Sequence, residues 1–221
     1  MRREEKFWYQ WIAFYSIGEM LGIGTAAMVA RFLLIEYSRS TYTSSTVLTA
    51  LVLILAGTIE GLIIGYVQWK SLSKLVTDFA PTKWITITTL ASISGWLFIL
   101  PPAVIVIFFF SQHFWLGNPH SILFTIITGL AFGGLIGMVQ YSIIKKFFNR
   151  ALTWVLATAI GWSLSFVFVY TALSLFSSPL YNIMLIAVAC ILSGLTQGVV
   201  NSTAVHLILR IKKEYERTIP H

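Results

Sequence analysis

The chain has 221 residues, of which 57% are hydrophobic and only 10% charged, and its mean hydropathy is +0.82. Soluble domains carry roughly 25% charged residues, so this composition excludes an ordinary water-soluble fold and predicts an integral membrane protein. The net charge of +7 would suggest nucleic acid as a partner in a soluble chain. Here the basic residues fall between apolar stretches, which the positive-inside bias explains, so no nucleic-acid partner is expected.

Six apolar stretches predict six membrane-spanning helices. We expect these spans at residues 7–35, 46–69, 84–110, 121–144, 152–176 and 180–209. Each is longer than the roughly 20 residues that cross a ~30 Å hydrocarbon core, and tilt can accommodate the extra length. Pro101 and Pro102 predict a kink or an early helix end in the third span, because proline removes a helix hydrogen bond. The expected fold class is an all-α membrane bundle, with one transmembrane domain over residues 1–221.

The distribution of basic residues predicts the orientation of these spans. All but two of the 15 Lys and Arg residues lie at the N-terminus, at the C-terminus, or in the loops after the second and fourth spans. The two exceptions are Arg31 and Arg39. Because cytoplasmic segments carry the excess of Lys and Arg, we expect a cell-membrane protein with both termini in the cytoplasm.

A stripe of small residues, spaced four residues apart and followed three residues later by an amide, occurs in three of the expected spans. It reads Gly57, Gly61, Gly65 and Gln68, then Gly129, Gly133, Gly137 and Gln140, and finally Cys190, Gly194, Gly198 and Asn201. Residues so spaced lie on one face of an α-helix, and small residues let two helices approach closely in lipid. We therefore interpret the glycines as helix-packing residues.

The spans that precede the stripes also match one another. Each has an early tryptophan, at Trp11, Trp84 or Trp154, followed by a glycine at 18, 95 or 161. The predicted unit is a helical hairpin, repeated at about residues 7–70, 84–145 and 152–210. Since each unit starts on the same side, the three repeats would be parallel and related by an axis along the membrane normal. In this alignment Glu19 corresponds to Trp96 and Trp162.

The pattern G-x-x-x-G-x-x-x-G-x-x-Q-[WY] at residues 57–69 and 129–141 is followed by W-[IV] and G-W. It resembles a group of uncharacterised bacterial multi-pass membrane proteins. The resemblance covers the second to fifth spans and implies a membrane location and hairpin repeats, but no catalytic activity. The six-span size is also similar to that of the substrate-binding subunits of vitamin uptake transporters, a similarity of architecture only.

Glu19 and Glu60 are the two acidic residues inside the expected spans, roughly 15–20 Å from the basic rim at ~1.5 Å per residue. An ionisable residue at this depth costs at least ~2.5 kcal/mol and usually faces protein or water. One interpretation is a proton or cation site, or a counter-ion for a cationic ligand; the other is a protonated side chain bonded to a neighbouring helix. Two carboxyls in one low-dielectric site cannot easily both ionise, so at least one should bind a proton or cation.

The three amides that end the stripes, Gln68, Gln140 and Asn201, are further ligand-binding candidates. They could converge as a polar collar around the repeat axis. Alternatively, each amide bonds a backbone carbonyl on the adjacent helix, which we favour because such amides commonly join membrane helices. Trp96 and Trp162 could line an apolar ligand pocket or fill the space opposite glycine, and we favour the second role.

Sequence motifs for catalysis are missing, including the nucleophile elbow, the P-loop and the zincin motif. We therefore expect no catalytic residue, no metal site and no cofactor. An enzyme that modifies lipids within the membrane stays open as an alternative. The predicted function is a small carrier or ligand-binding membrane subunit with its polar site at Glu19 and Glu60. The alternative is a structural or accessory subunit of a larger membrane complex, with another membrane protein as its partner. Both functions place the chain in the lipid bilayer.

Overall fold

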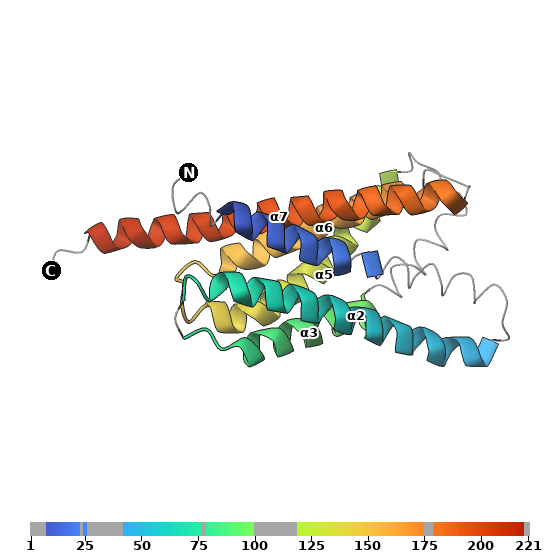
Figure 1. Cartoon of the computed structure of the whole chain (residues 1–221), viewed down its shortest axis with the longest axis horizontal. Helices are drawn as coiled ribbons and strands as arrows, with labels where there is room; N and C mark the ends of the chain where they lie inside the picture. Colours follow the sequence, from blue (N-terminus) through green and yellow to red (C-terminus); the bar gives the residue numbers. More distant parts are fainter. Residues whose placement is uncertain are drawn as a thin grey trace.

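The structure, a computed structural model, describes residues 8–22, 24–25, 42–76, 78–99, 119–174 and 179–218. These residues form six helices, and no strand occurs among them. The first helix covers residues 8–22; the others are α2 (Tyr42–Leu72), α3 (Pro81–Phe98), α5 (Pro119–Ile144), α6 (Leu152–Ser174) and α7 (Pro179–Thr218) (Figure 1). The prediction of an all-α fold is confirmed.

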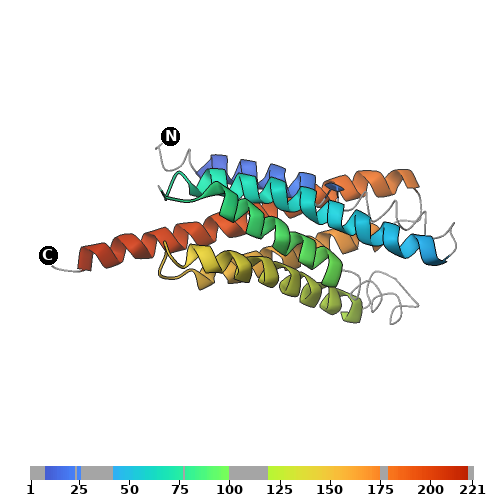
Figure 2. The same ribbon diagram turned by 90° about the horizontal axis from the view of Figure 1, so that it is seen from below.

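The six helices lie side by side around a common core (Figures 1 and 2). Along the chain, α2 packs on α3, α3 on α5, α5 on α6 and α6 on α7. The helix at residues 8–22 completes the arrangement, because Gly18 lies against Val67 of α2 and Ile12 lies against Gly198 of α7. The helices thus form a closed ring, and the last helix returns to the first.

The outer surface of this ring is apolar. Within the described residues, four helical segments are long and apolar enough to cross a membrane: Ala50–Leu72, His120–Ile144, Leu152–Ala172 and Ala187–Ile208. Their outward faces expose large aliphatic side chains, among them Leu55, Leu62, Leu123, Ile127, Leu156, Ile160, Leu195 and Val199. Soluble proteins rarely expose so much contiguous apolar surface to water, whereas lipid chains solvate it. The chain is therefore a multi-pass membrane protein in contact with the bilayer.

The first and third expected spans are not among these four segments. Helix α3 has 18 residues and includes Lys83 and several Ser and Thr residues, which lower its hydropathy. It begins at Pro81, three residues before the expected start, because proline suits the first turn of a helix. Residues 100–110 of the third span, and with them the kink expected at Pro101 and Pro102, lie outside the described residues. The described part of the first span is residues 8–22 and 24–25.

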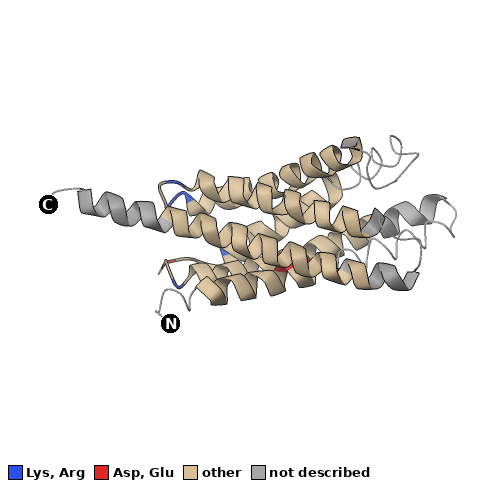
Figure 3. Cartoon of the chain, turned by 90° about the horizontal axis from the view of Figure 1, so that it is seen from above, with Lys and Arg blue, Asp and Glu red and all other residues tan. Residues whose placement is uncertain are grey.

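Charged residues are distributed along the bundle in two groups. The Lys and Arg residues whose side chains the structure describes gather near one end of the bundle (Figure 3). They are Lys70, Lys74, Lys83, Lys145, Lys146 and Arg150. Glu19 and Glu60, by contrast, are fully buried inside the bundle. The interior of this membrane protein thus holds two buried acids, and it is the place to look for a site.

Candidate functional site

The glycine stripes lie where helix backbones touch. A Cβ added at Gly57 would lie 2.7 Å from the Cα of Ile93, and one at Gly129 would lie 2.8 Å from the backbone N of Ser163. One at Gly198 would lie 2.9 Å from the carbonyl oxygen of Ile12. The stripes of α2 and α5 therefore pack on the helices that follow them, α3 and α6. The stripe of α7 packs on the helix at residues 8–22.

The three contacts share one register. Gly65 meets Ile85, Gly137 meets Val155 and Gly198 meets Ile12, and each partner directly follows a tryptophan. When the helices are aligned by these contacts, Gly95 of α3 lies one helical turn beyond the position that corresponds to Gly18 and Gly161. In this contact-based alignment of the repeats, the residue of α3 that corresponds to Glu19 is Ser92 rather than Trp96, and the residue of α6 is Trp162 as before.

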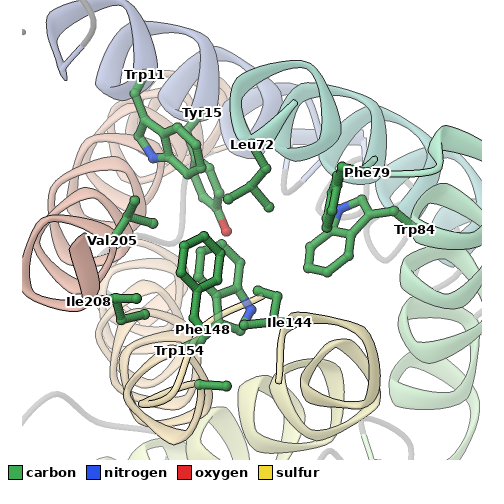
Figure 4. Close-up of a cluster of buried hydrophobic side chains, with 11 residues drawn as sticks. Trp11, Tyr15, Leu72, Phe79, Trp84, Ile144, Phe148, Trp154, Val205 and Ile208 are labelled. Carbon is green, nitrogen blue, oxygen red and sulfur yellow. The ribbon is translucent and has the colours of Figure 1, made fainter. Parts of the chain in front are cut away.

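A layer of aromatic and aliphatic side chains closes the core near the basic end (Figure 4). Trp11, Trp84 and Trp154 are each at most 1% exposed, and the rings of Trp84 and Trp154 pack edge to face at 6.1 Å. The layer also contains Tyr15, Leu72, Phe79, Ile144, Phe148, Ala151, Val205 and Ile208. It separates the polar interior from the loops that carry the lysines.

The amides of α2 and α5 meet directly above this layer. Gln140 Nε2 donates to Gln68 Oε1 at 2.7 Å and to Thr88 Oγ1 at 2.9 Å. Gln68 Nε2 donates to the Tyr15 hydroxyl at 2.7 Å, and Trp154 Nε1 donates to Gln140 Oε1 at 2.7 Å. All four bonds are buried, and they join five of the six helices through side chains alone.

Asn201 has hydrogen-bond partners different from those of the other two amides. Its Oδ1 accepts a bond from the Thr158 hydroxyl at 3.3 Å, while its Nδ2 donates to the carbonyl oxygen and to Oε1 of Gln197, both at 3.1 Å. The favoured expectation, that each amide bonds a backbone carbonyl on the adjacent helix, is wrong for Gln68 and Gln140. Their hydrogen-bond partners are the side chains named above, because their helices approach closely enough for the two amides to meet. Asn201 does bond a carbonyl, but on its own helix.

Glu60 lies against the first helix and is bonded to α3. It is 0% exposed, and its Oε2 accepts bonds from the Ser92 hydroxyl at 3.2 Å and from the indole N–H of Trp96. Its other oxygen, Oε1, has no hydrogen-bond partner among the described residues. A Cβ added at Gly22 would lie 2.9 Å from the Cγ of Glu60, so the backbone of the first helix passes directly beside this side chain.

Glu19 lies one turn before Gly22 and is also 0% exposed. Neither of its carboxyl oxygens makes a hydrogen bond of normal geometry with a described residue. Its electrostatic neighbours are the Tyr15 hydroxyl, one turn earlier on the same helix, and the carboxyl of Glu60. The structure thus brings Glu19 and Glu60 together where the first helix meets α2, with three buried carboxyl oxygens unpartnered.

Several residues that surround the acids were not singled out by the sequence. Tyr15, Thr88 and Ser92 look like ordinary polar residues in a membrane helix, since hydroxyls such as those of Thr89 and Ser94 bond the carbonyl four residues earlier. Trp96 was expected to fill space opposite glycine, and it does lie against Gly57. Its indole N–H is in addition a donor to Glu60, and only a three-dimensional arrangement reveals that role.

Comparison of the chain with models of protein families, with curated proteins and with solved structures found no match. The resemblance to the group of bacterial membrane proteins therefore stays a prediction. Within the described residues, no group of three or more His, Cys, Asp or Glu side chains could hold a metal ion. The function must be argued from the two acids and their neighbours.

Proposed function

We propose that the protein is a small membrane carrier, or the ligand-binding subunit of one, and that it binds a proton or a cation at Glu19 and Glu60. The observation that carries this proposal is that three buried carboxyl oxygens, both of Glu19 and one of Glu60, make no hydrogen bond of normal geometry with a described residue. Buried polar atoms almost always have a partner, and an unpaired one costs about 1–3 kcal/mol. A site that leaves three of them open is arranged for something that arrives from outside.

The depth of the acids supports this function. Glu19 lies eight residues beyond Trp11, which is about 12 Å along a helix. The aromatic layer and the amides Gln68 and Gln140 lie between the acids and the basic end of the bundle. The carboxyls are thus far from the rim, where a glutamate could reach water with its side chain, and their cost must be offset within the protein.

A second function, that of a structural or accessory subunit, is favoured by a different observation. The glycine stripes and the bonds between Gln68, Gln140 and Trp154 are the kinds of contact that join membrane helices without any ligand. In that case the partner is another membrane protein. The two functions differ in whether the charge of Glu19 and Glu60 matters once the bundle has folded.

We also infer that the chain is a ring of three hairpin repeats, at about residues 7–70, 84–145 and 152–210. The shared register of the three glycine contacts supports this repeat. With three hairpins the chain has six spans, and the gathering of the described basic residues near one end supports cytoplasmic termini.

Reporter fusions test this topology. Fusions at Lys74 and Lys146 should behave as cytoplasmic, and fusions near Thr43, Asn118 and Ser178 should behave as external. The reason is the excess of Lys and Arg in the loops after the second and fourth spans. Paired alkaline phosphatase and fluorescent-protein fusions at each position measure the side directly, and an external signal at either basic loop would overturn the six-span topology.

Thermal unfolding of the purified full-length protein tests the ligand site. The midpoint should rise on acidification or on addition of one of sodium, potassium, magnesium or calcium chloride, measured against choline chloride at equal ionic strength. A ligand that binds only the folded state stabilises it by about 2.7 kcal/mol at 100 times its dissociation constant. Glu19→Gln and Glu60→Gln should both abolish this response, because they keep the shape of the side chain but remove its charge.

Asp78→Asn is the matched control. Asp78 is exposed near the basic end, so its charge can be removed without touching the buried pair. The control should respond to salts and to pH as the wild type does. If the wild type responds to none of these ligands, or if the two glutamine variants respond as it does, the acids are structural and the carrier function falls.

A further inference from the structure

The chain of hydrogen bonds beside the acids has a direction, and Trp154 fixes it. An indole N–H can only donate, so Gln140 must present its amide oxygen to Trp154 and its NH₂ to Gln68. Gln68 then presents its oxygen to Gln140 and its NH₂ to Tyr15. The orientation of both amides follows from the one donor whose chemistry leaves no choice.

The chain ends at a hydroxyl whose proton is not used within it. Because the Tyr15 oxygen accepts the bond from Gln68, its own O–H remains to be donated elsewhere. Tyr15 and Glu19 are four residues apart and so share a helix face, and the two groups interact electrostatically. From Trp154 to Tyr15, each group thus donates its hydrogen bond towards Glu19, which favours a negative charge there. Hydrogen bonds that point the same way along a chain strengthen one another.

The carboxyl of Glu60 is also faced by hydrogen-bond donors. The two groups that bond Glu60 are the Trp96 indole, which is only a donor, and the Ser92 hydroxyl, for which the structure gives a bond donated to Glu60. Both acids are therefore faced by donors. No Lys, Arg or His side chain is buried among the residues that the structure describes. Among the described residues nothing supplies the positive charge that two carboxylates in an apolar bundle require, and a bound cation would supply it.

We propose that Trp154, acting through Gln140, Gln68 and Tyr15, presents Glu19 as a carboxylate, and that the site consequently takes a cation rather than a proton. This inference rests on the proposed function for the identity of the site and adds the class of its ligand. Trp154 is a positioning residue here, since its indole N–H donates to Gln140 and not to either acid. The cation would lie between Glu19 and Glu60, where the unpartnered oxygens are.

Infrared spectroscopy of the purified full-length protein at neutral pH tests this charge state. A protonated carboxyl shows a C=O stretch that a carboxylate lacks, and Glu19→Gln assigns any such band to Glu19. We expect no band of this origin in the wild type. It should appear in Trp154→Phe and in Tyr15→Phe, and it should disappear again when Glu19→Gln is added to either variant.

Trp84→Phe is the matched control for Trp154→Phe. Both tryptophans are 0% exposed in the same layer, and the indole nitrogen of Trp84 has no hydrogen-bond partner among the described residues. The two substitutions remove the same volume, but only one removes a donor from the chain. The concentration of cation that gives half of the thermal stabilisation should rise about fivefold in Trp154→Phe, as for loss of one hydrogen bond between neutral groups. It should change little in Trp84→Phe.

Each result decides one of the two proposals. A protonated band in the wild type that Glu19→Gln removes overturns the cation site, while the proposed function stands if acidification stabilises the wild type but not Glu19→Gln. Equal spectra and equal cation responses in Trp154→Phe and Trp84→Phe overturn the role of the chain. If Trp154→Phe does not fold, Tyr15→Phe decides instead, because it removes a single hydroxyl.

Discussion

Leucine in place of Gly61 or Gly133 should separate two helices and destabilise the bundle by at least about 1–3 kcal/mol. A Cβ at Gly61 would collide with the backbone of Thr89, and one at Gly133 would lie 2.8 Å from the Cα of Ala159. A backbone cannot move aside as a side chain can, so the whole helix must shift and its hydrogen bonds with the neighbouring helices are lost with it. Unfolding followed by circular dichroism in increasing detergent denaturant measures the effect.

Gly134→Leu is the control for both substitutions. Gly134 is the neighbour of Gly133 in α5, and a Cβ added there meets nothing within 4 Å. Ile136, which lies off the stripe, is a less suitable control position because it is 2% exposed and belongs to the core. Leucine there is a conservative swap, which usually costs less than about 1.5 kcal/mol. If Gly61, Gly133 and Gly134 tolerate leucine equally, the stripes are not contact faces.

Leucine at Gln140 should cause the second large loss of stability. It leaves three buried groups without their partner, namely the amide oxygen of Gln68, the Thr88 hydroxyl and the Trp154 indole. Bonds between membrane helices average about 0.6 kcal/mol and reach about 1.7 kcal/mol, so three of them predict a loss of roughly 2–5 kcal/mol. Unfolding in the same denaturant series gives the value.

The neighbouring amides provide an internal scale for this experiment. Gln68→Leu loses its bonds with Tyr15 and Gln140, and Asn201→Leu loses one bond between helices, with Thr158. The loss of stability should therefore decrease from Gln140 to Gln68 to Asn201. Ser142→Ala, in which the lost bond is with a carbonyl of the same helix, should be close to wild type. A different order would mean that packing, not hydrogen bonding, holds the amides in place.

The all-α fold could be predicted from the sequence because apolar stretches and lipid leave few alternatives to the helix. The spacing of Gly57, Gly61 and Gly65 likewise identified one face of α2. It could not identify the helix that this face meets, since periodicity within one helix carries no information about its neighbours. The partner is α3, the next helix in the chain, and the corresponding stripe of α7 meets the first helix.

The candidate site, too, could be predicted only in part from the sequence. That Glu19 and Glu60 are neighbours could be expected from two consecutive helices, and the contact of Gly22 with Glu60 places them together. The donors Ser92 and Trp96 come from α3, beyond the first hairpin, and their role depends on the order of helices around the ring. The glycine alignment placed Trp96 opposite Glu19 in the repeat, and the helix contacts instead give that position to Ser92.

The closure of the ring has a consequence for the biogenesis of the protein. The helix at residues 8–22 leaves the ribosome long before α7, and the contacts of its Ile12 and Ser16 with Gly194 and Gly198 form only after α7 has been made. At typical rates of synthesis that delay is roughly 10–40 s. During this interval the nascent chain holds two acids in an incomplete bundle with one side open to lipid or to the insertion machinery. Chains that end before α7 should therefore be recognised by membrane quality control as unfinished, although they contain both halves of the candidate site.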